Sequence, residues 1–218
     1  MSNDALEADV KNAIELGHDV QEQVKQMTLR RIDARSLDIE SLQKISASVL
    51  RGARAAVQKE LNLSSAQAQT ARVQLKQAVA GLDSALAQVA SAAKLAIEEA
   101  AGRAQQYSSE DLAHARANLE NIENMFLETL QNSASSAKDA ASDILRDILA
   151  HSRTQGSAVG TQIKEALSVI THQLGATGRT HAATGLHLAE ATSDLLRQIA
   201  AGVLTGVAEH IKPADKGS

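Results

Sequence analysis

The seven histidines are the side chains of this 218-residue sequence best suited to catalysis or metal binding. Glu15 and His18 have the three-residue spacing with which ferritin-like bundles hold iron, and Asp111 and His114 repeat that spacing. An iron site of this kind also needs two further carboxylates that point inward from facing helices. Glu and Asp are nearly absent from the apolar stripes of this sequence, so we predict no metal site.

Sequence motifs of common catalytic and nucleotide-binding sites are also missing. The chain has no His-Glu-x-x-His zinc motif, no phosphate loop, no dinucleotide fingerprint and no nucleophile elbow. It has no cysteine, which excludes disulfides and thiolate chemistry and agrees with a reducing cytoplasm. We therefore predict no catalytic residue, no cofactor and no enzymatic activity.

The composition predicts a helical protein. The single proline, Pro213, follows the last apolar repeat, and alanine, the best helix former, is abundant, whereas a proline inside a helix costs about 3 kcal/mol. There is no Trp, one Tyr and one Phe, so bulky side chains for a globular core are lacking. We predict an all-α protein: an elongated antiparallel helical bundle or coiled coil with four to six amphipathic helices, two of them long.

The net charge and the hydropathy limit the classes of partner and the cellular location that we expect. The net charge of −4 gives no overall attraction for nucleic acid. The first residues lack the basic region and apolar run of a signal peptide, and no uncharged apolar stretch approaches the ~20 residues that span a bilayer. We expect a cytoplasmic protein without a transmembrane segment, either free or associated with the surface of a granule or membrane.

Changes in pattern along the chain divide it into four parts. These are an N-terminal amphipathic helix (1–35), a core of long helices with a joint near 107–109 (36–153), Gly/Ala-rich C-terminal helices (154–212) and a disordered tail (213–218).

Two shorter boundaries are visible inside these parts. Near Asn62 two interpretations stay open: a break followed by a serine cap at Ser64 or Ser65, or a continuous rod. Gly156 predicts a helix end and Ser157 the cap of the next helix.

Two apolar stripes, Leu75–Ala104 and Leu112–Ile148, are the main functional signal. The second predicts one nearly straight helix of about 40 residues, a rod of roughly 60 Å. The stripes contain more apolar positions than the helices of a single bundle can pair, and this favours a homo-oligomer. They pack either on one another or on a polymer or lipid surface, and the residues predicted to bind a surface or partner are Leu75, Val79, Leu82, Leu86, Val89, Leu112, Leu119, Ile122, Phe126, Leu130, Ile144 and Ile148.

The segment LAQVASAAKLAIEEAAGRAQQ, which begins at Leu86, and its continuation Ser108–Leu112 resemble bacterial phasins. Phasins are small Ala-rich helical proteins that coat polyhydroxyalkanoate storage granules. The resemblance spans roughly residues 80–150 and implies a non-enzymatic coat on a granule or neutral lipid surface, without a motif whose residues carry over. The whole chain also resembles an uncharacterised proteobacterial family of helical proteins. The alternative function is a soluble homo-oligomeric coiled-coil scaffold that binds only protein partners.

Overall fold

The computed structural model describes residues 3–32, 38–102, 109–136 and 139–177, and its regular structure there is entirely helical. The prediction of an all-α protein is confirmed. The elements are α1 (Asn3–Leu16), α2 (Val20–Arg31), α3 (Ile39–Val57), the short 3-10 helix η2 (Glu60–Asn62), α4 (Ser65–Gly102), α5 (Ser109–Ser135), α6 (Ala140–Gln155) and α7 (Ala158–Thr177).

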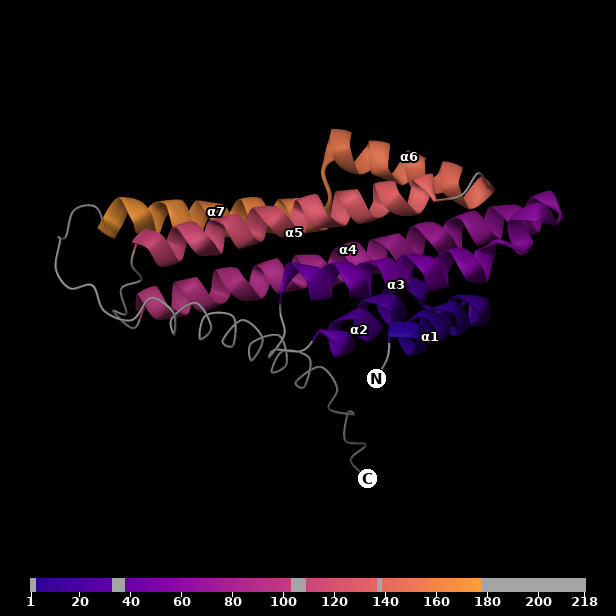
Figure 1. Ribbon diagram of the computed structural model, residues 1–218, viewed down its shortest axis with the longest axis horizontal. Helices are drawn as coiled ribbons and strands as arrows, with labels where there is room; N and C mark the ends of the chain where they lie inside the picture. The colour runs from indigo at the N-terminus through magenta and orange to yellow at the C-terminus, as the bar shows by residue number, and fades with distance from the viewer. Residues whose placement is uncertain (1–2, 33–37, 103–108, 137–138, 178–218) are drawn as a thin grey trace, which may run out of the picture.

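The helices form an elongated bundle of three layers (Figure 1). In the middle layer α3 and α4 are antiparallel, and α4 is 38 residues, or about 57 Å, long. On one side α1 packs on α3 and α2 packs on α4. On the other side α5 packs against α3, while α6 and α7 follow one another back along α5, and α7 also packs on α4.

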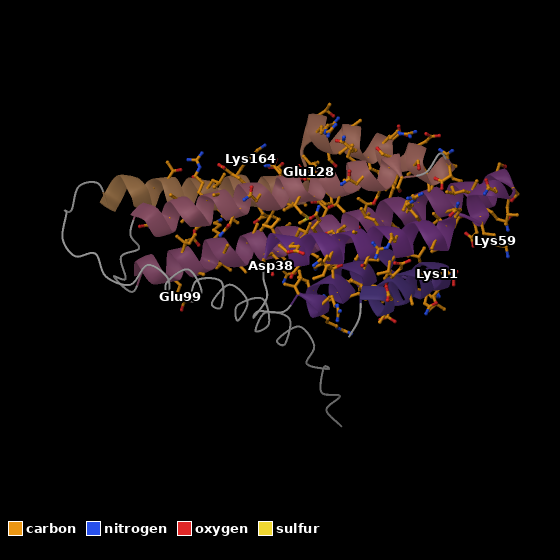
Figure 2. The ribbon with its side chains drawn as sticks, in the orientation of Figure 1. Lys11, Asp38, Lys59, Glu99, Glu128 and Lys164 are labelled. Atoms are coloured by element: carbon orange, nitrogen blue, oxygen red, sulfur yellow. The ribbon has the colours of Figure 1, made fainter. Side chains whose placement is uncertain are left out.

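Small residues bring the helix backbones of the first two layers close together. A Cβ atom on Gly52 of α3 would overlap the carbonyl oxygen of Glu7 in α1. A Cβ on Gly81 of α4 would likewise overlap the carbonyl oxygen of Gln21 in α2. Alanines are also buried along α4, among them Ala71, Ala78, Ala85, Ala90 and Ala93. Lys11, Glu128 and Lys164 are examples of charged side chains on the outside of the bundle (Figure 2).

The single helix predicted for residues 1–35 is wrong, because the structure has two helices there. Gly17 and Asp19 adopt left-handed conformations, with φ of 72° and 44°, and the chain reverses between α1 and α2. The apolar pattern continues across this turn because both helices bury their stripes, with Val10 and Val24 both fully buried. Periodicity alone therefore did not reveal the turn.

The continuous helix predicted from Leu112 to Ile148 is also wrong, since α5 ends at Ser135 and α6 begins at Ala140. Asp139 caps the start of α6: its Oδ1 accepts a hydrogen bond from the backbone N–H of Ser142 at 2.9 Å. With these two unexpected breaks, the described residues contain seven α-helices, more than the four to six expected.

The structure has a break near Asn62, where the sequence left two interpretations open, and the predicted boundary at Gly156 is confirmed. η2 ends at Asn62, and Ser64 and Gln67 then bond reciprocally as a capping pair before α4. α6 ends before Gly156, which has a φ of 89°, and the Ser157 hydroxyl accepts a hydrogen bond from the N–H of Gly160 at 3.0 Å. The predicted C-terminal helices beyond Thr177 and the predicted tail (213–218) lie outside the described residues.

The close contacts at two glycines predict that replacing either glycine by alanine destabilises the bundle. Gly52→Ala and Gly81→Ala should each lower the free energy of unfolding by about 1 to 3 kcal/mol, because two backbones must separate. Gly160→Ala in α7 is the matched control. There the added Cβ would meet only the end of the Glu123 side chain, which can rotate away, and the Ser157 hydroxyl. Urea unfolding followed by circular dichroism measures all three, and equal losses at the three sites would contradict close backbone packing.

Candidate functional site

The twelve residues predicted from the apolar stripes lie inside the bundle. Eleven are buried, and the twelfth, Ile148, is half-buried against the same hydrophobic core. The structure thus brings both stripes together in one interior instead of leaving them as two outward faces. The buried members are Leu75, Val79, Leu82, Leu86, Val89, Leu112, Leu119, Ile122, Phe126, Leu130 and Ile144.

The histidine and carboxylate pair of the N-terminal region lies on the surface. Glu15 and His18 are both exposed, and the backbone carbonyl of His18 accepts a hydrogen bond from the Gln23 side chain at 2.6 Å. The side chains of Asp111 and His114 lie outside those that the structure describes. Among the described side chains, no group of three or more His, Asp or Glu is close enough to hold a metal ion.

A cleft of about 560 Å³ lies between α4, α6 and the turn that leads into α7. Three of the twelve predicted residues form its apolar lining: Val79, Phe126 and Ile148. Exposed charged and polar side chains lie at its rim, among them Lys76, Asp147 and His151. An apolar lining with a few polar groups suits an apolar side chain or a small amphipathic ligand.

Two acidic residues line this cleft, the exposed Asp147 and the partly buried Asp83, and no sequence pattern predicted a role for Asp83. Its Oδ2 accepts the backbone N–H of Ala158 at 2.8 Å, and its Oδ1 accepts that of Val159 at 2.9 Å. Burial raises the pKa of Asp83, although these two hydrogen bonds oppose the rise. Because both carboxylate oxygens bind the start of α7, the main role of Asp83 is to fix α7 on α4.

A second polar contact connects the middle layer to the turn between α5 and α6. The Arg54 guanidinium bonds to Asp139 at 3.3 Å and to the carbonyl of Ser133 at 3.0 Å. Partial burial disfavours the charged form of Asp139. The hydrogen bonds from Ser142 and Arg54 outweigh this effect and lower the pKa of Asp139 below its usual value.

These two carboxylates predict opposite pH dependences of stability. The pKa of Asp139 is lowered from 3.8, so its stabilisation is present above that pH and is lost as the pH falls through the folded pKa. The pKa of Asp83 is raised from 3.8, so its contribution is greatest below that pH and decreases as the pH rises through the folded pKa.

Urea unfolding of the wild type, Asp139→Asn and Asp83→Asn between about pH 3 and about pH 7 tests this assignment. On acidification, the stability advantage of the wild type over Asp139→Asn should shrink. Its advantage over Asp83→Asn should grow. Differences that move in the same direction would show that one of the two environments is assigned incorrectly.

None of the described helices is long and apolar enough to cross a membrane. No curated protein and no solved structure matches the chain. A family model does match, over residues 1–213, and its description is "Family of unknown function (DUF6781)". Since the match covers all the helices described above, the chain belongs to the DUF6781 family.

Proposed function

We propose that this protein is a non-enzymatic helical scaffold of the cytoplasm that associates with itself and binds protein partners through its outer surfaces. One observation carries the proposal: eleven of the twelve stripe residues are buried within a single chain. Residues that already pack on one another are not free to coat a granule while the bundle is closed. Partner binding is therefore left to the polar outer faces and the cleft near Asp83.

The spacing of the polar contacts supports a scaffold that keeps one shape. Arg54 attaches the middle layer to Asp139, and Asp83 attaches the start of α7 to α4. Farther along α4, Lys94 pairs with Glu165 of α7 at 3.2 Å. Each contact holds one helix pair in register, so the outer helices keep fixed positions relative to α3 and α4.

A phasin-like surface coat is the second candidate, and the composition of the core favours it. The α4 face is rich in alanine, which buries little apolar area, and burial stabilises by roughly 25 cal/mol per Å². The Lys94–Glu165 pair is partly exposed and adds little resistance to separation. A chain that opened between α4 and α7 would present to a polymer or lipid surface the part of the α4 face that α7 covers.

A test of the two candidates must control opening without unfolding the core. Substituting Leu82, Leu86 and Val89 by glutamine is unsuitable, because these side chains are at most 2% exposed. Carbodiimide instead joins a lysine to a carboxylate that it already contacts, so treatment should couple Lys94 to Glu165 and lock α7 onto α4. Lys94→Arg is the matched control, because a guanidinium keeps the ion pair but does not form the amide.

Coupled protein, uncoupled protein and Lys94→Arg are floated with polyhydroxybutyrate particles and with neutral and anionic liposomes. The scaffold proposal predicts that all three stay at the bottom of every gradient. A different result would favour the coat: the uncoupled protein floats, coupling abolishes this flotation, and carbodiimide-treated Lys94→Arg still floats. The scaffold proposal would then be wrong, and the protein would be a coat that opens. Flotation that coupling leaves unchanged would contradict both candidates, because the outer faces would then bind the surface.

A further inference from the structure

A second groove lies on the outer layer formed by α1 and α2, away from the cleft near Asp83. It measures about 500 Å³, and every residue that lines it belongs to α1 or α2. In Figure 1 this helix pair forms one outer side of the bundle. The lining includes Leu6, Asp9, Ala13 and Leu16 from α1 and Met27 and Arg30 from α2.

The groove has an apolar floor and an exposed leucine at one end. Leu6 and Ala13 are buried, and Met27 is half-buried. Leu16, next to the turn between the helices, is 70% exposed, more than any other large hydrophobic side chain in the described ranges. A groove and an exposed apolar side chain on the same surface are what two copies need to pack on each other.

The two walls of the groove carry opposite charge. α1 has four acidic residues and one basic residue, whereas α2 has three basic residues and one acidic residue. Asp9 on the α1 wall and Arg30 on the α2 wall are both exposed. Within the described part of the chain, neither of these two side chains forms an ion pair. A surface of this kind is complementary to itself when α1 of one copy lies over α2 of another.

We propose that a second copy of this chain occupies this groove. The two α1–α2 pairs pack face to face about a two-fold axis parallel to the helices, with the turn ends together. Leu16 of each copy then lies at the turn end of the other groove, and Asp9 faces Arg30 of the second copy. This inference rests on the self-association included in the proposed function and names the surface that carries it.

The positions along the helices agree with this pairing. Asp9 precedes the end of α1 by seven residues and Arg30 follows the start of α2 by ten, which places them about 10 Å and about 15 Å from the turn. The offset of about 5 Å is within the reach of an arginine side chain. The face is about 21 Å by about 20 Å, so the two copies together bury roughly 800 Å², the size of a weak and reversible contact.

Sedimentation velocity of the full chain from about 1 µM to about 500 µM tests the proposal. The wild type should show a reversible monomer–dimer equilibrium. Asp9→Lys and Arg30→Glu should each raise the dissociation constant by roughly tenfold or more, because like charges then face each other. An equimolar mixture of these two variants should recover dimers, because the introduced lysine meets the introduced glutamate only in the mixed pair. Leu16→Glu should weaken the dimer without recovery.

Glu128→Lys and Lys164→Glu are the matched charge controls, because both residues are exposed and lie on the opposite side of the bundle from α1 (Figure 2). Both variants should dimerise like the wild type, and circular dichroism should show unchanged helicity for every variant. A wild type that stays monomeric, or a mixture that does not recover dimers, would overturn the proposal. The flotation result is independent of this outcome, so failure of the groove contact is distinguishable from failure of the scaffold.

Discussion

Close approach of helix backbones through small residues is the constraint on which the rest of this structure depends. A chain with one Phe, one Tyr and no Trp cannot fill wide spaces between helices. Its helices must instead lie near one another, and Gly52 and Gly81 allow this where α1 and α2 cross the middle layer. Because each apolar face is narrow, a helix must be long to bury enough apolar area. This accounts for the 38-residue α4 and the elongated bundle around it.

Polar side chains decide where the helices begin. Asp83 binds the first N–H groups of α7 from the side of α4, and Asp139 caps α6 while it pairs with Arg54 of α3. Apolar stripes alone permit neighbouring helices to slide, because one alanine or leucine resembles the next. A carboxylate that must meet one particular helix start removes this freedom and fixes the register of the layers.

The features that the sequence predicted depend on neighbouring residues. The lack of proline predicted the all-α class, and Gly156 with Ser157 predicted a helix boundary, because a glycine at positive φ and a serine cap act locally. The break before Asp139 was missed although its cap on Ser142 is local, because the apolar stripe continues across it; its second partner, Arg54, is 85 residues away in the chain. The role of Asp83 was missed because the backbone groups that it binds are 75 and 76 residues away, and the turn at Gly17 was missed because the apolar pattern continues across it.

The stripe residues themselves were chosen correctly as apolar and periodic, but their partner could not be read from the sequence. A stripe on a helix has the same pattern whether it faces another helix, a second chain or a surface. In the structure both stripes face the interior, and the surfaces left outside are the polar ones, the cleft near Asp83 and the groove between α1 and α2. Function is therefore expected at these outer features while the bundle remains closed.

The central claim is that the stripes are closed within the free chain, and thiol labelling tests it most directly because the chain has no cysteine. Ala90 is 0% exposed and Leu95, little more than one turn farther along α4, is 61% exposed. In the free protein, Leu95→Cys should react at the rate of an open thiol, and Ala90→Cys should react at least about a hundredfold more slowly. Similar rates for the two cysteines would contradict the closed bundle.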